Sequence, residues 1–239
     1  GANAIQGEAN LTFDGSKLGV GTDSPTVNAQ IQSSGANSLL KLAGTTSGSG
    51  INDGLDVGIN GSDGILWNRE NGNILLATNN SERFRISPDG VVTKPYQPAF
   101  YARGTTTWTT VTDGTTITVP ASDEEFDMGG HYDSTTNYRF TAPVVGKYFF
   151  FATLYTRLST RPSTSSEYVS SHFHKNGVYV AGTSNIHHYY NNGDYDMANT
   201  IQRLMSLSAN DYIELKLKPS GDDGQYYGKH VSWGGWLVS

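Results

Sequence analysis

Short alternating apolar runs, closed one after another by tight-turn sequences, restrict the fold of this chain more than any other feature. The turns include Asn60-Gly61, Asn71-Gly72, Pro88-Asp89-Gly90, Asp113-Gly114 and Asn176-Gly177. Asn-Gly and Asp-Gly readily adopt the positive φ angles that two-residue β-hairpin turns require. Short runs with a period of two between such turns are typical of strands. The sequence therefore predicts an all-β protein.

Composition agrees with this prediction. Charged residues make up 16% of the 239 residues, and glycine occupies 28 positions. Thr, Tyr and the other β-branched and aromatic residues favour strands, whereas Gly and Asn favour turns. One stretch, Ile201–Leu207, is ambiguous between helical and strand periodicity.

Charge and cysteine content exclude several function classes. The 22 Asp and Glu outnumber the 16 Lys and Arg, which gives a net charge of −6, and no basic stripe is present. We therefore expect no nucleic-acid partner, because such proteins neutralise phosphates with Lys and Arg. No apolar run approaches the roughly 20 residues of a membrane helix, so we expect no membrane insertion. The absence of cysteine excludes disulfides and thiolate metal sites.

A change in composition divides the chain. The segment Lys94-Pro95-Tyr96-Gln97-Pro98 contains two prolines, which favour an extended linker. We predict a β-rich segment over 1–93, a linker over 94–98 and a second domain over 99–239. The N-terminal segment consists of short strands with little apolar content. We expect it to bury its apolar faces against other copies of itself, the alternative being a disordered Gly/Ser linker.

Two motifs in the N-terminal segment resemble elements of phage tail fibres. Residues 18–25 (LGVGTDSP) resemble the "GIGT-x-x-P" element of these fibres and related adhesins, and residues 71–91 resemble the element "gn-i-tnn-seRmrI-x-x-dG-v" that accompanies it. The resemblance implies a trimeric fibre shaft or shoulder. No second GIGT element follows Val91, which suggests that the shaft ends there and a head begins.

The C-terminal segment has longer strands. Lys147–Leu154 is its most apolar run, and Asn176-Gly177 is the strongest hairpin signal. Ile213, Leu215 and Leu217 alternate with polar residues, so we expect one face to point inward. Many strands joined by short turns predict a sandwich or jelly roll.

This segment resembles the globular head of complement C1q, a relative of tumour necrosis factor. Residues 140–150 match "F-x-A-P-x-x-G-x-Y-x-F", and residues 132–133, 175–177, 210–215 and 233–238 match further elements in the family's order. Ala152 and Asn210 depart from the pattern. The resemblance implies a ten-strand jelly roll that assembles as a homotrimer.

Aromatic content points to the same assembly. The 4 Trp, 14 Tyr and 9 Phe are more than one sandwich core needs, and aromatic residues are enriched at subunit contacts. We expect the apolar C-terminal strand with Trp233, Trp236 and Leu237 to be buried near the trimer axis.

Two predicted loops combine aromatic rings with amides and carboxylates, the mixture that binds glycans. The candidate receptor- or glycan-binding residues are His187, His188, Tyr189, Tyr190, Asn192, Asp194 and Tyr195 in the first loop, and Tyr226 and Tyr227 in the second. The alternative is that these loops form subunit contacts.

We expect no cofactor, although two metal sites are conceivable. His172 and His174 share one face of a strand, and three copies on an axis would offer six imidazoles to a transition metal. Calcium is the alternative, held by Asp194, Asp196, Asp222 and Asp223.

We expect no enzymatic activity. A glycosidase needs two closely placed carboxylates, one of them with a raised pKa. The pairs Glu124-Glu125, Asp194/Asp196 and Asp222-Asp223 all fall in predicted Gly- or Asn-rich turns, where solvated acids are the better interpretation.

Taken together, these features predict a bacteriophage tail fibre tip, a trimeric receptor-binding protein on the outside of the virion. Its partners would be a host surface glycan or outer-membrane receptor, and other tail proteins. The latter would bind an N-terminal part that we expect to be missing, because the sequence starts at Gly1. The alternatives are a structural trimerisation module, a polysaccharide depolymerase, or a bacterial or animal C1q-like lectin.

Overall fold

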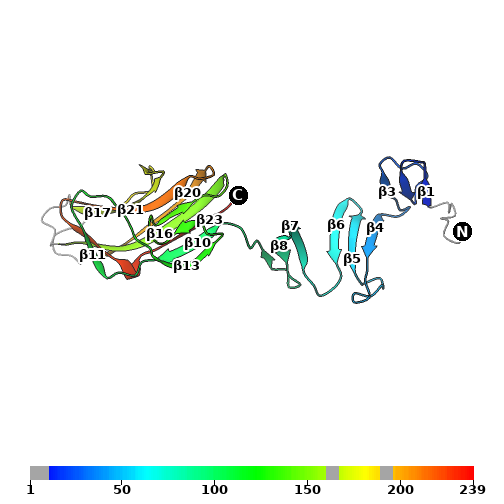
Figure 1. The fold of residues 1–239 in the computed structure, drawn as a ribbon, viewed down its shortest axis with the longest axis horizontal. Coiled ribbons are helices and arrows are strands. Elements are labelled where there is room, and N and C mark those ends of the chain that lie inside the picture. Colours follow the sequence, from blue (N-terminus) through cyan, green and yellow to red (C-terminus); the bar gives the residue numbers. More distant parts are fainter. Residues whose placement is uncertain (1–10, 160–166, 189–195) are drawn as a thin grey trace. The chain divides into compact units, whose positions relative to one another are not determined.

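The computed structural model describes residues 11–159, 167–188 and 196–239, and it is all-β, as predicted (Figure 1). The chain divides into two compact units, Gly1–Lys94 and Pro95–Ser239. Ile201–Leu207 lies in a strand. Within the described part of the chain, no helix combines the length and apolar character of a membrane span.

The N-terminal unit contains small sheets of three strands each over its described residues. Their strands are β1 (Leu11–Phe13), β2 (Leu18–Val20) and β3 (Ala29–Ile31); β4 (Asn37–Leu42), β5 (Leu55–Asn60) and β6 (Asp63–Asn68); and β7 (Ile74–Thr78), β8 (Ser81–Ile86) and β9 (Val92–Thr93). Strands β2 and β3 are parallel, and the other neighbours are antiparallel. Asn79 and Asn80 close the β7–β8 hairpin with φ angles of 48° and 55°, as the turn chemistry requires.

Each small sheet has an apolar face. In the second sheet, Leu40 lies opposite Val57, and Val57 lies opposite Leu66. These three side chains are 48%, 38% and 45% exposed. The other face of β5 carries Asp56, which binds Arg69 Nε at 2.6 Å and Lys41 Nζ at 3.2 Å. Arg69 and then Lys41 hold the pKa of the Asp56 carboxyl below its ordinary value.

The apolar faces of the other two small sheets also meet solvent. Their exposed members include Phe13, Leu18, Val20 and Ile31 in the first sheet, and Leu76 and Val92 in the third. Over residues 11–94, no Val, Leu, Ile, Phe or Trp side chain is buried.

The C-terminal unit is a sandwich of two seven-stranded sheets over the described residues. The β16 sheet contains β10 (Ala99–Arg103), β11 (Trp108–Val111), β13 (Asp123–Met128), β16 (Gly146–Leu158), β20 (Met197–Leu207), β22 (Gly224–Tyr227) and β23 (Ser232–Leu237). The β21 sheet contains β12 (Ile117–Thr118), β14 (Tyr132–Asp133), β15 (Arg139–Thr141), β17 (Tyr168–Lys175), β18 (Val178–Tyr179), β19 (Asn185–His188) and β21 (Tyr212–Ser220). A 3-10 turn, η1 (Gly228–His230), joins β22 to β23. The predicted sandwich is confirmed.

Aromatic rings fill the space between the two sheets. Phe100 stacks on Tyr132 at 4.7 Å and on Phe140 at 5.1 Å, and the edge of Trp233 meets Phe100 at 4.7 Å. Trp233 Nε1 donates to the Tyr132 hydroxyl at 3.2 Å, and that hydroxyl donates to the Ala121 carbonyl at 2.8 Å. Burial raises the pKa of Tyr132. Trp233 therefore fills the core of its own chain, whereas Trp236 of the same strand is 43% exposed.

Two glycines let β23 pack closely beneath aromatic rings. A Cβ on Gly235 would lie 2.5 Å from the Phe150 ring, and a Cβ on Gly234 would lie 2.6 Å from the Phe100 carbonyl oxygen. Since real Cβ atoms do not approach so closely, the Gly234-Gly235 pair between the two tryptophans is a packing requirement.

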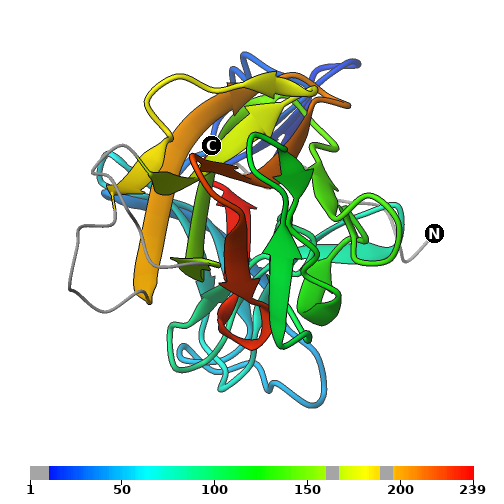
Figure 2. The same cartoon turned by 90° about the vertical axis from the view of Figure 1, so that its left-hand side faces the viewer.

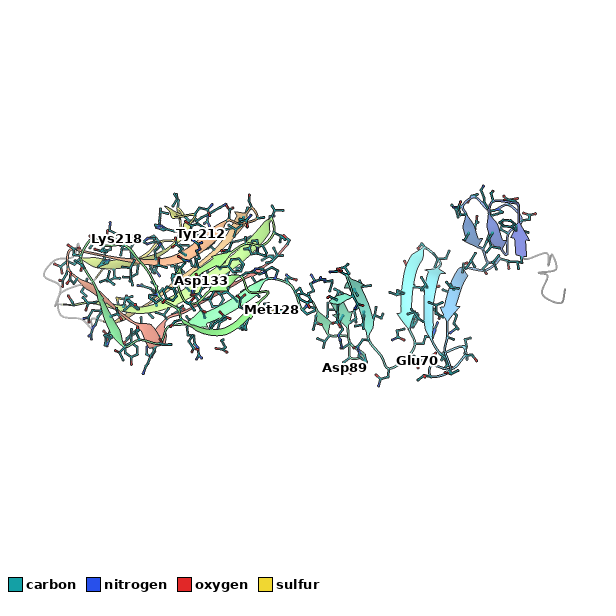
Figure 3. All side chains as sticks on the ribbon, viewed as in Figure 1. Glu70, Asp89, Met128, Asp133, Tyr212 and Lys218 are labelled. Atoms are coloured by element: carbon teal, nitrogen blue, oxygen red, sulfur yellow. The ribbon has the colours of Figure 1, made fainter. Side chains whose placement is uncertain are left out.

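The sandwich has two distinct ends. Gln97 Nε2 donates to the Leu237 carbonyl and Lys147 N donates to the Ser239 carbonyl, so the chain enters and leaves at one end, here called the base. Strand β11 lies towards the other end, the apex (Figure 1), and η1 follows β22, which pairs with β11. Figure 2 views the molecule from the apical side. In Figure 3, Met128 marks the base, and Lys218 lies nearer the apex than Tyr212.

Candidate functional site

Strand β16 carries large side chains on both of its faces. Its burial alternates with strict period two, so that Tyr148 and Phe150 point into the core while Phe149 and Phe151 point outward. Such alternation normally separates an apolar face from a polar one. Here the outer face is aromatic as well, which makes it the most unusual surface of the unit.

Five aromatic residues at the basal end of this outer face form what we call the basal patch: Tyr101, Phe126, Phe149, Phe151 and Trp236. Ring centroids are 4.9 Å apart for Phe149 and Trp236, and between 6.2 and 6.3 Å apart along the series Trp236, Phe151, Tyr101 and Phe126. Phe126 is 48% exposed. Exposed aromatic patches of this kind are typical of protein–protein contacts.

A second group of large side chains, which we call the apical cluster, lies on the same sheet at the apex: Trp108, Tyr155, Arg157, Tyr227 and His230. The guanidinium carbon of Arg157 lies 3.8 Å from the centre of the Trp108 ring. Trp108 is 5.7 Å from Tyr155 and 5.3 Å from Tyr227. His230 meets Tyr155 at 5.3 Å and Tyr227 at 4.9 Å, edge to face.

Polar groups adjoin the apical cluster. Arg157 Nε donates to Gln225 Oε1 at 2.6 Å, and Gln225 Nε2 donates to Thr110 Oγ1 at 3.0 Å. The Tyr155 hydroxyl donates to Asp196 Oδ2 at 3.3 Å, and Asp196 Oδ1 lies 3.9 Å from Arg157 Nη1. Rings, amide, carboxylate and guanidinium are thus held together by pairings between neighbouring strands.

A polar band separates the basal patch from the apical cluster. On the outer face of β16, Thr153 lies between Phe151 and Tyr155, and its hydroxyl is 3.3 Å from that of Thr200. Ser232 lies opposite Thr153 on β23. The aromatic side chains of this face therefore fall into two groups.

The predicted glycan loops have different outcomes. His187 and His188 belong to strand β19, paired with Val169 and Tyr168. Tyr189, Tyr190, Asn192, Asp194 and Tyr195 lie outside the described residues. The second predicted loop is wrong in its conformation, because Gly224–Tyr227 forms strand β22. Its alternation turns Tyr226 into the core, where the side chain is 2% exposed, and Tyr227 outward into the apical cluster.

The predicted histidine pair is present on the outer face of the β21 sheet. Phe173 points into the core, and the rings of His172 and His174 are 5.0 Å apart. His172 is buried against Tyr179, and this burial lowers the pKa of His172 to about 4. A neutral imidazole can bind a metal ion. Across the described residues, no group of three or more His, Asp or Glu is placed to hold a metal ion.

Of the predicted acidic pairs, Asp222-Asp223 serves local structure, whereas Asp194 lies outside the described residues. Asp223 Oδ1 accepts from Asp113 N at 2.8 Å, Asp113 Oδ1 accepts from Gly221 N at 2.8 Å, and Asp222 Oδ1 accepts from Asp223 N at 2.7 Å. These bonds order the turn between β21 and β22.

The predicted turn around Glu124-Glu125 is wrong, since both residues lie in strand β13. This strand forms the edge of the β16 sheet and pairs with β10 across a bulge. Arg103 pairs there with Asp123 at 3.0 Å and with Glu125 at 3.4 Å. An edge strand can carry solvated acids because one of its sides has no neighbour.

Sequence reasoning missed Trp108, Tyr155 and Arg157. The three residues come from two strands, and their pairing with β22 depends on a register that no local motif records. One usable signal was present in the sequence of β16. Phe149, Phe151 and Tyr155 occupy alternate positions that face one side of the strand, and Tyr148 and Phe150 occupy the positions that face the other side, so both faces carry aromatic residues.

No family model and no curated protein matches the chain. Among solved structures, it is similar to the globular domain of zebrafish complement 1qA protein, with 14% identity over 60% of this chain and 98% of that chain and a TM-score of 0.43. It is also similar to murine APRIL (9% identity, 59% and 99% covered, TM-score 0.42) and to Eiger TNF from S. frugiperda (12%, 60% and 94%, TM-score 0.41).

Proposed function

We propose that this chain is the distal part of a bacteriophage tail fibre, a homotrimeric tip on the outside of the virion that attaches it to a host cell. The observation that carries the proposal is the basal patch. Aromatic side chains as large as Trp236 and Phe126 remain 43% and 48% exposed on a sheet whose other face is already a complete core. Burial against neighbouring copies would remove this apolar surface from water.

The N-terminal unit supports the same assembly. Each of its small sheets leaves an apolar face exposed, represented by Phe13, Val57 and Leu76. Single three-stranded layers of this size gain little from burial within one chain, whereas ordering their backbone costs about 1–2 kcal/mol per residue. Three copies facing one another would supply the missing core.

The fibre-type motif has a physical basis in this chain. Gly21 has a φ of +78°, and a Cβ on it would collide with the Gln32 carbonyl. A Cβ on Gly19 would lie 2.5 Å from the Thr22 carbonyl. The two glycines are therefore required for the tight packing between β2, β3 and the following turn. The resemblance of residues 18–25 and 71–91 to tail-fibre elements is the reason for assigning a fibre rather than another trimeric protein.

In this role the head acts through several weak contacts at once. Three identical apices on one axis would each touch a surface glycan or outer-membrane receptor, and the summed avidity can exceed a single affinity by about 10²–10⁴. Other tail proteins would hold the opposite end of the fibre.

Adsorption to cells tests the proposal. The fluorescently labelled chain is incubated with a panel of bacterial strains, and bound protein is measured by flow cytometry. We expect saturable adsorption to a subset of strains, and protection of those strains from phage that infect them. Absence of adsorption to every strain, in a preparation of folded trimer, would overturn the attachment role.

A matched pair of variants links adsorption to assembly. Trp236→Asp places a charge in the basal patch, so the trimer should dissociate and adsorption should fall by about 100-fold or more as avidity is lost. Val178→Asp is the control, because Val178 is 69% exposed in the β17–β18 hairpin of the other sheet. It should leave both mass and adsorption unchanged.

A further inference from the structure

We propose that the apical cluster is a binding site for a neutral pyranose sugar of the host surface. This inference rests on the attachment function and names the place of contact and the class of ligand. Four aromatic rings adjoin one another there: Trp108 and His230 each contact both Tyr155 and Tyr227, with centroid distances of 4.9–5.7 Å. They come from β11, β16, β22 and η1, which the sheet pairing brings together.

The arrangement of the rings suits a sugar better than it suits a protein core. In the four contacting pairs the ring planes are inclined at 36°, 56°, 67° and 72°, so none of these pairs stacks face to face. Trp108, Tyr155 and Tyr227 are half-buried and His230 is exposed. Rings held in this way present apolar surface to solvent at fixed positions, and the C–H face of a pyranose packs on such a surface.

The polar neighbours supply partners for hydroxyl groups. Arg157 uses Nε on Gln225 and packs on Trp108, but a guanidinium has five N–H donors. Asp196 Oδ1 is buried and accepts no hydrogen bond from the described residues. A buried carboxylate oxygen without a donor costs free energy unless a ligand or water satisfies it. The Asp196 side chain as a whole is 36% exposed, so its carboxylate can also accept a hydrogen bond from a sugar hydroxyl at Oδ2, beside the Tyr155 hydroxyl.

Charge at the site favours a neutral sugar over an acidic one. Arg157 is balanced by Asp196, whose carboxylate lies 3.9 Å from the guanidinium. The chain as a whole carries a net charge of −6, which repels anionic ligands. An acidic saccharide would have to compete with Asp196 for Arg157.

The position of the cluster allows binding and assembly to coexist. Its residues come from β11, β22, η1 and the far part of β16, on the apical side of the sheet, whereas the chain enters the sandwich at the base; β11 is labelled in Figure 1. The polar band of Thr153, Thr200 and Ser232 separates it from the basal patch. A trimer built on the basal patch would therefore carry its three clusters at the tip that meets the host.

Fluorine NMR of the full chain labelled with 5-fluorotryptophan tests the site directly. The chain has four tryptophans, so Trp67, Trp233 and Trp236 serve as internal controls, and Trp108→Phe assigns the Trp108 resonance. The probes are the methyl glycosides of glucose, galactose, mannose and N-acetylglucosamine. We expect saturable movement of the Trp108 resonance with at least one of them, with a dissociation constant of about 1–10 mM. No saturable change with any probe, or equal movement of all four resonances, would overturn the proposal.

Two variants separate a binding site from a structural cluster. Tyr227→Ala removes one ring and should weaken the sugar response by about tenfold or more, while the assembled mass stays the same. Tyr179→Ala removes a 47% exposed ring from the other sheet and should leave the sugar response unchanged. If Tyr227→Ala dissociates the assembly instead, the cluster is a subunit contact. Arg157→Gln gives a second test. If this variant dissociates the assembly but keeps the sugar response, Arg157 is a subunit contact and not part of a sugar site, which would also contradict the proposal.

The same variants distinguish failure of the site from failure of the attachment role. If Tyr227→Ala trimers still adsorb to cells as strongly as the unsubstituted chain, the sugar site is wrong and attachment stands. If the unsubstituted chain adsorbs to no strain but its Trp108 resonance responds to a pyranoside, the site stands and the attachment role is wrong.

Discussion

The two units of this chain solve the problem of burial in different ways. In the C-terminal unit, two sheets enclose Phe100, Phe140, Phe150 and Trp233, all within 1% of full burial. Over residues 11–94 of the N-terminal unit, no comparable apolar side chain is buried, and the most enclosed side chains include that of Asp56. Similar turn chemistry and strand alternation therefore yield a self-sufficient fold in one case and an incomplete one in the other.

What differs is the number of layers. A sheet with one apolar face needs a second layer to cover that face. The C-terminal unit provides this layer itself, because its β21 sheet packs over its β16 sheet. The N-terminal sheets have no covering layer among residues 11–94, so their stability in this account comes from neighbouring copies.

The largest expected effect comes from a charge on an N-terminal apolar face. Val57→Asp should dissociate the proposed trimer, since the substitution would occur three times and each copy would lose about 2 kcal/mol of apolar burial in addition to the cost of a desolvated charge. Sedimentation velocity measures the result. Ser62→Asp, in the exposed β5–β6 turn, is the control. An unchanged mass for Val57→Asp would show that this face needs no partner.

Two tryptophans of one strand give the next comparison. Trp233→Ala should lower the free energy of unfolding of the C-terminal unit by about 3–5 kcal/mol, because it leaves a cavity in the core. Trp236→Ala should weaken assembly while leaving the intrinsic stability of the unit within about 0.5 kcal/mol. Denaturant titrations measure both effects when they are run at one protein concentration at which the copies are assembled and at another at which they are dissociated. Equal losses of unfolding free energy, with no change in mass, would break the distinction between inner and outer faces.

The buried histidine predicts a pH dependence confined to the C-terminal unit. The pKa of His172 is about 4 in the folded chain, chiefly because of burial and secondarily because of His174, Lys216 and Lys218, against an ordinary value of 6.5. As the pH falls, His172 is therefore protonated in the unfolded chain before it is protonated in the folded chain. The stability that is present above pH 6.5 is lost as the pH falls towards 4.

The loss should be on the order of 2–3 kcal/mol. His172→Gln should remove most of it, which urea titrations at a series of pH values can measure. An identical pH profile in His172→Gln and the unsubstituted chain would contradict the assignment to this ring.

The smallest expected effect tests the tight packing of β23. Gly235→Ala should cost about 1–3 kcal/mol, because the new methyl group overlaps the Phe150 ring. Gly35→Ala in the N-terminal unit is the control, since a Cβ there meets nothing closer than the Ser33 hydroxyl at 3.6 Å. Thermal unfolding compares the two, and a loss as large for Gly35→Ala would deny the steric explanation.

Strands and hairpins were predictable wherever a local signal defined them. Asn79-Asn80 and Asn176-Gly177 adopt the positive φ angles that their sequence favours. The predicted run Lys147–Leu154 is shorter than β16 because the strand continues through polar Thr156 and Arg157, which pair with β22. The acidic strand β13 was not predicted, because its sequence DEEFDM has no apolar alternation. An edge strand buries little apolar surface and does not require this pattern.

The candidate site was predictable only in part. Tyr227 was expected to bind a ligand and does lie in the apical cluster, whereas Tyr226, its neighbour, points into the core. Neighbouring residues of a strand point to opposite faces, so a shift of one residue exchanges the inward and outward positions. The sequence alone does not determine which of the two tyrosines points outward. Trp108 and Arg157 are separated by many residues, and the pairing of β11 and β16 with β22 brings them into contact.

Sedimentation equilibrium across a dilution series tests the dependence on neighbouring copies most directly. The account predicts a species of three times the 25.8 kDa chain mass. Hydrogen exchange on the same dilution series should show that the amides of β5 lose their protection once dilution separates the copies. A single 25.8 kDa chain that keeps full protection of β5 at every concentration would contradict it.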